Sequence, residues 1–214
     1  MWAEYQAAYY SDRPQVTEWK SSPLANDHDF SDVPDGYEII TRHTQVIDLS
    51  YPLPMLWQGV RKSYHSIIHR ANEQYDDIRQ DISIIPFRLT HHAAFGNVRT
   101  EQTFIEQSKW LASGYGISVS ATSSTEEGTH STVAAAYWII YKGYAYYASG
   151  PAIEKNVQHA VIWKSLELLK DKGIQFVDMG QVDGDSVKER NIGKFKAGFG
   201  GRAVPFQIVR KVQA

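Results

Sequence analysis

The spacing of apolar residues divides most of the chain into short amphipathic segments. Alternating apolar and polar side chains, as in 45–49, are typical of a half-buried strand. Apolar residues that recur every three or four positions are typical of a helix with one buried face. The pattern predicts strands at 45–49, 81–89, 116–121, 132–141, 144–149, 175–179 and 203–212. It predicts helices at 55–74, 98–113, 157–172 and 187–199.

Turn and cap residues support these boundaries. Pro52 and Pro54 precede the first helix, and proline is tolerated in a first helical turn. Thr100 is a plausible cap for the second helix. Lys142-Gly143 predicts a hairpin turn, whereas Pro86 marks 81–89 as an edge strand. The resulting order of elements is β-α-β-α-β-β-β-α-β-α-β. This order predicts an α/β fold with a mixed sheet.

Residues 1–43 do not show this regularity. Prolines and Ser-Asp clusters interrupt the segment, so we expect an irregular arm with one short helix near 2–10. Many of its residues are aromatic, and we expect them to pack on the main body: Trp2, Tyr5, Tyr9, Tyr10 and Trp19. The sequence therefore predicts an aromatic-rich N-terminal arm at 1–43 and one domain at 44–214.

Composition narrows the classes of function. The 214 residues carry a net charge of −2, which gives no overall attraction to nucleic acid. The chain has no cysteine, which excludes disulfides, cysteine-based zinc sites and a thiol nucleophile. The first ten residues lack the pattern of a signal peptide, and the longest apolar stretch, Val133 to Tyr141, is too short to span a membrane. We expect a cytoplasmic protein with no membrane span.

Several strings in the sequence carry a resemblance to a known family. In the C-terminal half they are Ser149-Gly-Pro-Ala, Val157 to Trp163, Gly173 to Gly180 with its Asp178-Met-Gly ending, and Gly193-Lys-Phe-Lys-Ala-Gly-Phe-Gly-Gly201. Thr44 to Ser50 and the basic segment Leu56 to Ala71 fit as well. Together, over roughly 44–205, they resemble the Fem-type peptidoglycan aminoacyltransferases of the GNAT acyltransferase superfamily. Family members often carry two such domains and a coiled-coil arm, whereas this chain has room for one domain.

The resemblance implies a fold and an activity. The fold is a mixed, mostly antiparallel twisted sheet with splayed central strands and flanking helices. The activity is transfer of an acyl group from a thioester, with acyl-coenzyme A (acetyl-coenzyme A) as co-substrate, to an amine. The acceptor would be a small molecule or a sugar or cell-envelope precursor.

Two other functions stay open. One is an aminoacyl-tRNA-dependent transferase acting on a peptidoglycan precursor. It would bind tRNA through a basic helix face: Arg61, Lys62, His65, His69 and Arg70. The other is a GNAT-like domain without catalysis that binds a partner through its aromatic arm.

The resemblance also locates the donor. In GNAT folds the donor lies where the fourth and fifth strands splay, which corresponds here to 144–149 and 175–179. Backbone N–H groups near Tyr147 could polarise the carbonyl, and the start of the next helix could bind a pyrophosphate. The loop at 150–159, which occupies this place, lacks the Arg-x-x-Gly-x-Gly/Ala string of typical coenzyme A users. The candidate donor-binding residues are Ser149, Gly150, Lys155, Asn156, Gln158 and His159.

Three residues are candidates for catalysis. In the Fem pattern, Lys196 is the residue implied to stabilise the oxyanion or a phosphate; the alternative is an ordinary surface lysine. Asp183, after the strand that ends at Gly180, could orient or deprotonate the acceptor amine, or simply form a turn. Tyr147 is a candidate general acid near the splayed strands.

Histidine pairs do not predict a metal site. His65 and His69 are four positions apart, but without a His-Glu-x-x-His string we expect a solvated basic face. His91 and His92 are adjacent in the strand predicted at 81–89 and would point apart. We therefore expect no metal.

Overall fold

The computed structural model describes residues 18–20, 36–75, 77–124 and 130–212. The described residues fall into two compact units. Of the described residues, the larger unit comprises 46–75, 77–124, 130–180 and 198–201. The smaller unit comprises 18–20, 36–45, 181–197 and 202–212 of the described residues. The chain passes from one unit to the other within the strands β2 (Tyr37–Asp48) and β7 (Phe176–Gln181).

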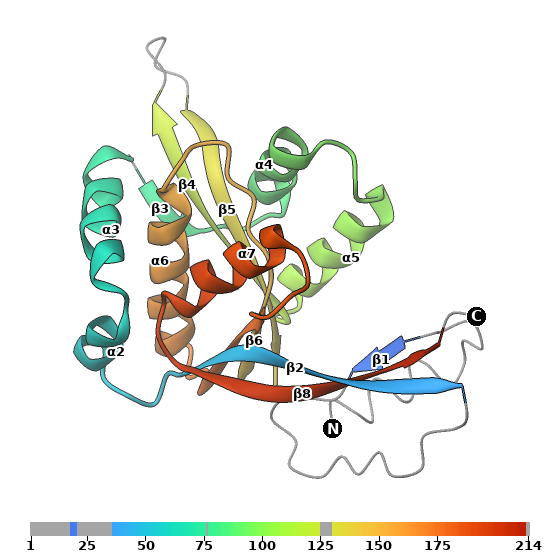
Figure 1. The fold of residues 1–214 in the computed structure, drawn as a ribbon. Coiled ribbons are helices and arrows are strands. Elements are labelled where there is room, and N and C mark those ends of the chain that lie inside the picture. Colours follow the sequence, from blue (N-terminus) through green and yellow to red (C-terminus); the bar gives the residue numbers. More distant parts are fainter. Residues whose placement is uncertain (1–17, 21–35, 76, 125–129, 213–214) are drawn as a thin grey trace. The chain divides into compact units, whose positions relative to one another are not determined.

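The larger unit contains a mixed sheet (Figure 1). Its strands lie in the order β7-β6-β5-β4-β3. All neighbours are antiparallel except β6 and β7, which are parallel. The four strands besides β7 are β3 (Asp77–Gln80), β4 (Gly116–Ser124), β5 (His130–Tyr141) and β6 (Tyr144–Ser149). The mixed, mostly antiparallel sheet is the predicted fold class.

Helices cover both faces of this sheet. Helices α4 (Ile85–Phe95) and α5 (Glu101–Ala112) lie on one side of β4 and β5, and α6 (Val157–Asp171) lies on the other (Figure 1). Helix α3 (Lys62–Gln74) packs on α6. Because both faces are covered, the segment from Val133 to Trp138 in β5 is completely buried and reads as a continuous run rather than an alternation.

The hairpin between β5 and β6 is formed as predicted. Lys142 and Gly143 both have positive φ, at 46° and 82°, which is the backbone of a tight hairpin turn. Tyr141 and Tyr144 close the turn as facing partners. The hairpin fixes which residues of β6 reach the end of the sheet where the site lies.

The prediction of a strand at 81–89 is wrong. This segment is a short loop followed by α4, and Pro86 lies in the first helical turn. Asp81 turns inward and accepts hydrogen bonds of 2.6 Å from the hydroxyls of Ser118 and Ser120. The strand in this region is β3, just before it. The apolar residues follow a helical period, since Ile84, Phe87 and His91 are buried.

The helix predicted at 55–74 consists of two helices. Helix α2 (Leu53–Gly59) ends before Val60, and α3 begins after Arg61. Both intervening residues have extended backbones, and the N–H of Arg61 donates to the carbonyl of Gly198 at 2.8 Å. Val60 is buried at the break. The break therefore serves packing within the larger unit.

The smaller unit is built on β2, helix α7 (Val187–Ala197), β8 (Arg202–Lys211) and β1 (Glu18–Lys20). Its strands lie in the order β1-β8-β2, and β1 is antiparallel to β8 with Trp19 opposite Val209. The helix predicted at 2–10, with Trp2, Tyr5, Tyr9 and Tyr10, lies outside the described residues. The division at residue 44 into arm and domain stays a prediction.

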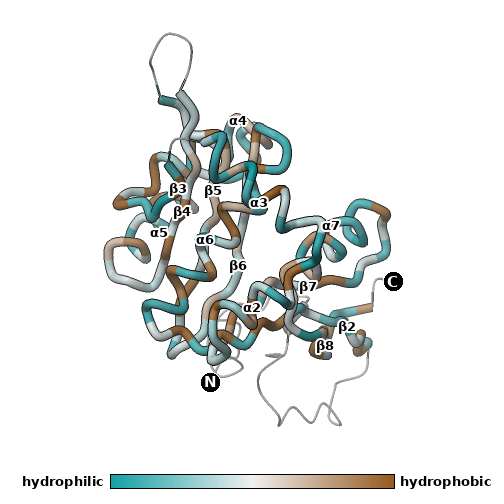
Figure 2. The backbone as a smooth tube through the Cα atoms, turned by 90° about the vertical axis from the view of Figure 1, so that its left-hand side faces the viewer, coloured by the Kyte–Doolittle hydropathy of each residue, from teal (hydrophilic) through white to brown (hydrophobic). Residues whose placement is uncertain are grey.

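Hydropathy follows this arrangement. The helices change between hydrophobic and hydrophilic residues along their length, as amphipathic surface helices do (Figure 2). Among the described residues, no helix is both long enough and apolar enough to cross a membrane.

Candidate active site

Strands β6 and β7 separate at the end of the sheet. Their parallel register runs from the pair Tyr144–Phe176 to the pair Tyr146–Asp178, although β6 continues to Ser149. Beyond this point the chain follows β5, because the N–H of Ala135 donates to the carbonyl of Pro151 at 2.9 Å. The splayed central strands that the resemblance implied are therefore present.

A bulge in β6 lies at the point of separation. Tyr137 faces Ser149 while Trp138 faces Tyr147, so Ala148 is an extra residue in β6. Bulges bend a strand and re-aim its side chains. Here the bulge directs the last residues of β6 away from the regular ladder with β7. Tyr147, the candidate general acid, directly precedes the extra residue.

Tyr147 belongs to a buried polar cluster in the larger unit. Nε2 of Gln158 donates to the Tyr147 hydroxyl at 3.1 Å and to the carbonyl of Ala135 at 3.1 Å. The Tyr147 ring lies 4.9 Å from the ring of Trp138. A Cβ at Gly150 would overlap both the Tyr147 hydroxyl and the Gln158 amide. Gly150 is therefore the residue that leaves room for this pair.

The electrostatics of the cluster keep Tyr147 protonated. Burial raises the pKa of Tyr147 well above its usual value, and the hydrogen bond from Gln158 lowers it by less. Because the Tyr147 oxygen accepts from Gln158, its own proton is left to donate to another acceptor. Among the described residues, two buried atoms of the same cluster, Oε1 of Gln158 and Nε1 of Trp138, have no hydrogen-bond partner. Buried polar atoms without a partner are few in native structures.

The start of α6 suits an anion. Asn156 precedes the helix in a left-handed conformation (φ 71°), and within the described residues no side chain caps the helix start. The first turn contains no acidic residue, and exposed Lys155 lies just before it. Backbone N–H groups and the helix dipole favour negative charge at this end. The residues present thus fit the pyrophosphate of a nucleotide carrier.

His159 is held in the same helix start by packing. Its Nδ1 lies 3.0 Å from the carbonyl of Asn156, and its ring meets the Tyr64 ring edge-on at 4.3 Å. Burial lowers the pKa of His159, the Asn156 carbonyl raises it, and nearby Arg61 lowers it again. Tyr64 also lies against Gly198, where a Cβ would overlap its ring. One role of Gly198 in the glycine-rich string is therefore to admit Tyr64.

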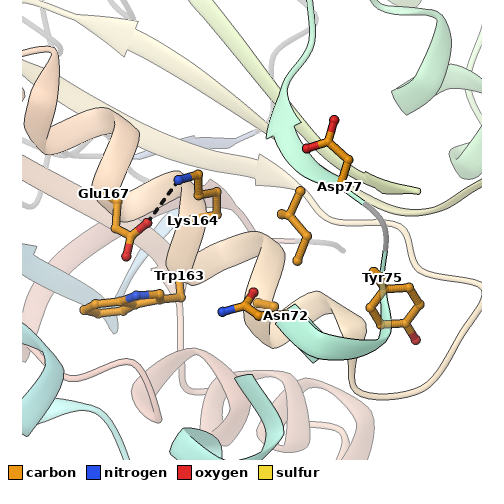
Figure 3. Close-up of a pocket in the computed structure, with 8 residues that line it drawn as sticks. Asn72, Tyr75, Asp77, Trp163, Lys164 and Glu167 are labelled. Atoms are coloured by element: carbon orange, nitrogen blue, oxygen red, sulfur yellow. Dashed lines mark hydrogen bonds and ion pairs between the residues drawn. The ribbon is translucent and has the colours of Figure 1, made fainter. Parts of the chain in front are cut away.

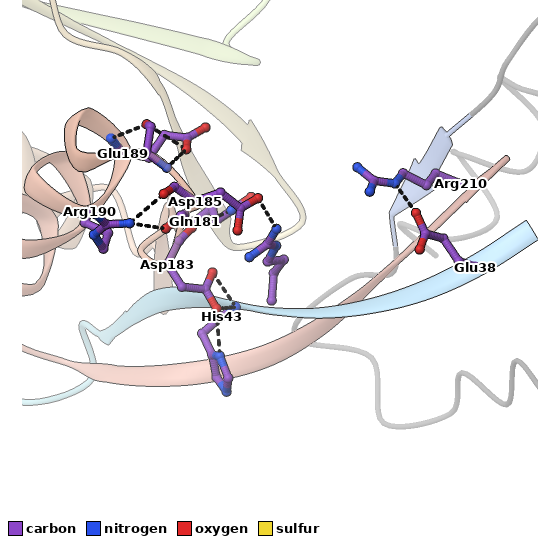
Figure 4. A network of polar contacts seen from close by, with 11 residues as sticks. Glu38, His43, Gln181, Asp183, Asp185, Glu189, Arg190 and Arg210 are labelled. Atoms are coloured by element: carbon purple, nitrogen blue, oxygen red, sulfur yellow. Dashed lines mark hydrogen bonds and ion pairs between the residues drawn. The ribbon is translucent and has the colours of Figure 1, made fainter. Parts of the chain in front are cut away.

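In the smaller unit, Asp183 holds His43. The backbone N–H of His43 donates to Oδ1 and Oδ2 of Asp183 at 3.0 and 2.9 Å, and the ring Nδ1 lies 3.0 Å from Oδ2 (Figure 4). The next residue before Asp183 is also paired with β2, since the N–H of Val182 donates to the carbonyl of His43 at 2.9 Å. Asp183 thus fixes both the backbone and the imidazole of His43.

Lys196 lies on α7 and reaches back to the segment that contains Asp183. Its Nζ donates to the carbonyl of Gln181 at 3.2 Å, and the Gln181 amide donates to the carbonyl of Asp183. A Cβ at Gly193 would overlap the backbone of Val182, so only glycine lets α7 approach this closely. The smaller unit therefore brings Lys196 and Asp183, two of the predicted catalytic residues, to one short segment.

A second ion pair braces the same loop. The guanidinium of Arg42 lies 2.7 Å from Oδ2 of Asp185, and the guanidinium of Arg190 donates to the backbone carbonyl of Asp185 at 2.6 Å. The hydrogen bond from Arg42 is the main reason that the pKa of Asp185 is lowered. Ser186 and Glu189 cap the start of α7 reciprocally (Figure 4). The loop between β7 and α7 is thus fixed independently of His43.

The basic helix face proposed for tRNA is only partly exposed to solvent. His65 stacks on Trp57 with ring centres 4.2 Å apart, and its Nε2 lies 3.0 Å from the Trp57 carbonyl. Arg61 lies over the Tyr64 ring. Lys62, His69 and Arg70 are exposed. His91 and His92 lie in α4 rather than in a strand, and His91 is buried, so the expectation based on strand geometry is corrected.

The larger unit also contains a pocket between α3, β3 and α6, with a volume of about 280 Å³. Trp163 and Tyr75 are among its lining residues, and the Lys164–Glu167 ion pair of 3.4 Å lies at its wall (Figure 3). The hydroxyl of Tyr75 donates to Glu154 at 2.9 Å. None of the predicted site residues lines this pocket.

The structure distributes the predicted residues between the two units. Tyr147, Gly150 and Gln158 form one cluster in the larger unit. Lys155 and Asn156 lie between Gly150 and Gln158 in the chain, just before α6. Ser149 is partly exposed at the end of β6. Sequence reasoning missed His43, because no local motif marks it.

No protein-family model and no curated protein sequence matches the chain. Its fold is similar to the crystal structure of FemX, with a TM-score of 0.64 and 10% identity over 80% of this chain and 65% of that one. It is also similar to L-PGS from Bacillus licheniformis, with a TM-score of 0.56 and 12% identity over 82% of this chain and 62% of that one. The C-terminal domain of a putative lysylphosphatidylglycerol synthetase from Agrobacterium fabrum is similar as well, with a TM-score of 0.53 and 12% identity over 82% of this chain and 61% of that one.

These similarities establish the fold. The chain has the Fem-type, GNAT-like architecture that its C-terminal strings implied. It spans less than two thirds of the length of each of these three proteins.

Proposed function

We propose that the protein is an N-acyltransferase that moves an acyl group from a thioester donor, acyl-coenzyme A, to an amine. The acceptor is a small molecule or a sugar or cell-envelope precursor, and the reaction takes place in the cytoplasm. The fold, which it shares with FemX and the lysylphosphatidylglycerol synthetase domain, supports a group-transfer enzyme. Acyl-coenzyme A supplies the activated carbonyl.

The observation that carries this proposal is the separation of β6 from β7 beyond Tyr146 and Asp178. Because of this separation, the free end of β6 carries the protonated Tyr147 and leads to the start of α6, which suits a phosphate. A thioester donor needs both features, because its carrier is anionic and its leaving group takes up a proton. Ser149, Gly150, Lys155, Asn156, Gln158 and His159 are the proposed donor-binding residues.

Each proposed catalytic residue has a separate role. Lys196 stabilises the negative charge that develops on the carbonyl oxygen. Asp183 acts on the acceptor amine, and Tyr147 protonates the leaving group. The C–N bond forms, the C–S bond breaks, and the thiol leaves. No metal takes part in this scheme.

The test is the melting temperature with coenzyme A and with acetyl-coenzyme A. A ligand at ~100 times its dissociation constant adds ~2.7 kcal/mol of stability. For a chain of this length that is a rise of roughly 5 to 10 °C. Lys155→Glu should reduce the rise, whereas the control Lys172→Glu, at the exposed opposite end of α6, should keep it. No rise in the wild type would exclude coenzyme A as a tight ligand.

An aminoacyl-tRNA-dependent reaction on a peptidoglycan precursor is the second candidate. The observation in its favour is the exposed basic face of α3 with Lys62 and Arg70. Binding through this face should weaken steeply with salt, because phosphate contacts release counterions. Replacing both residues by alanine should weaken tRNA binding and reduce its dependence on salt. Binding of tRNA together with no response to coenzyme A would favour this candidate.

A further inference from the structure

We propose that His43 is the base that accepts the proton of the acceptor amine, and that Asp183 is the residue that positions it. This inference rests on the proposed acyl transfer and names the proton acceptor within it. It changes the role of Asp183, which acts through His43 rather than on the amine itself.

The hydrogen bonds determine which ring nitrogen is available. A carboxylate only accepts hydrogen bonds, so Nδ1 of His43 must carry the proton that it donates to Oδ2 of Asp183. Nε2 is then the unprotonated nitrogen of the neutral ring, and among the described residues it has no hydrogen-bond partner. An imidazole held by a carboxylate at Nδ1 with a free Nε2 is the arrangement that a general base requires.

The backbone makes this arrangement rigid. Asp183 accepts from the backbone N–H of His43 as well as from its ring, and Val182 bonds to the His43 carbonyl. An ordinary surface ion pair joins only two side-chain tips, which move independently. The side chains of His43 and Asp183 are 48% and 36% exposed, so a solute can reach Nε2.

The charges around His43 are mixed in sign. On its own strand Arg42 is paired with Asp185, and the loop after β7 contributes Asp183 itself. Helix α7 carries Lys188, Glu189, Arg190, Lys194 and Lys196. The adjacent strand β8 carries Arg202, Arg210 and Lys211, and Arg210 is paired with Glu38 at 2.6 Å. Asp183 is the carboxylate in direct contact with the ring.

The proton transfer balances with the rest of the reaction. The amine nitrogen forms a bond to the carbonyl carbon, and its N–H proton passes to Nε2 of His43. The C–S bond breaks, its electron pair leaves on sulfur, and the thiolate takes up a proton. The imidazolium then returns its proton to solvent, so His43 is regenerated without any further reactant.

The test compares His43→Asn with Asp185→Asn in the full chain. Asparagine keeps a side-chain donor for Asp183 but has no basic nitrogen. We expect kcat/KM with an amine acceptor to fall about 10² to 10⁴-fold. The decline of activity on the acid side, which reports protonation of Nε2, should disappear. Asp185→Asn removes a carboxylate of the same loop that contacts Arg42 instead of His43, and it should stay within about twofold of the wild type.

Two results would overturn the inference. One is a His43→Asn enzyme that transfers at the wild-type rate with the wild-type pH profile. The other is a nitrogen NMR spectrum in which His43 of the intact protein carries its proton on Nε2 instead of Nδ1. The NMR measurement needs no activity, so it tests the dyad even when the wild type acylates no amine, which would instead contradict the proposed function.

Discussion

The hydroxyl of Tyr147 and the amide of Gln158 lie 3.1 Å apart at the end of β6, and Gly150 is packed against both groups. A methyl group at Gly150 has no space unless this pair separates. Gly150→Ala should therefore destabilise the protein by about 1 to 3 kcal/mol, the usual cost of overpacking. Urea denaturation measures this change.

The matched control for Gly150 is Gly59→Ala. Gly59 lies at the end of α2, and a Cβ there meets no atom within 4 Å. We expect its stability to stay within about 0.5 kcal/mol of the wild type. Equal losses in both variants would show that the space around Gly150 does not matter.

Removal of the Tyr147 hydroxyl should separate donor binding from transfer. Tyr147→Phe keeps the ring that packs on Trp138 but removes the proton that we assign to the leaving group. We expect kcat to fall about 10² to 10⁴-fold, while the melting-temperature rise with coenzyme A is retained. A variant with normal kcat would assign Tyr147 to packing alone.

Substitution of Lys196 should reduce catalysis more than stability. Loss of one group that stabilises an oxyanion lowers kcat by about 10² to 10³-fold. We expect such a loss for Lys196→Ala in a steady-state assay with any accepted amine. Lys188→Ala, an exposed lysine of the same helix, is the control and should be normal. Parallel losses in stability and activity for Lys196→Ala would assign the residue to anchoring α7 through Gln181.

The buried carboxyl of Asp81 should make stability depend on pH. Burial raises its pKa, while hydrogen bonds from Ser118 and Ser120 lower it by less. The folded state therefore holds this proton more tightly than the unfolded chain. The stability contribution is fully present below the unfolded pKa and is lost as the pH rises through the folded pKa.

Comparison with Asp81→Asn isolates this effect. Between pH 7 and pH 4 the wild type should gain stability relative to the variant, measured by urea denaturation at each pH. The variant lacks the ionisable group, so other carboxyl groups cancel in the difference. A wild type that loses stability relative to the variant on acidification would show that the serine hydrogen bonds outweigh burial.

Much of the fold could be predicted because most elements follow local patterns. The hairpin at Lys142-Gly143 and the strand 144–149 were predicted with their observed bounds, and α6 to within one residue. The segment 81–89 was not, because Ile-Ser-Ile-Ile-Pro-Phe suits a strand by composition. In the structure Asp81 turns inward and accepts hydrogen bonds from serines 37 and 39 positions away, and no local window contains that information.

The site residues that the sequence points to stay predictions. The glycine-rich string pointed to Lys196, and the strand ending before it pointed to Asp183. His43 was missed because its partner lies 140 positions away in the chain. That pairing exists only after β2 and the segment following β7 have aligned. A histidine in an exposed position of a strand carries no signal of its own.

The four residues Gly198–Gly201 have a consequence for synthesis of the protein. They complete the larger unit, where Gly198 lies against Tyr64, Gly200 against Gly59 and Gly201 against Val46. All other residues of that unit have been translated by Gly180. The ribosome must therefore synthesise α7 before the larger unit is complete. A nascent chain that stops at Ala197 would lack the contacts that Gly198–Gly201 make within the larger unit.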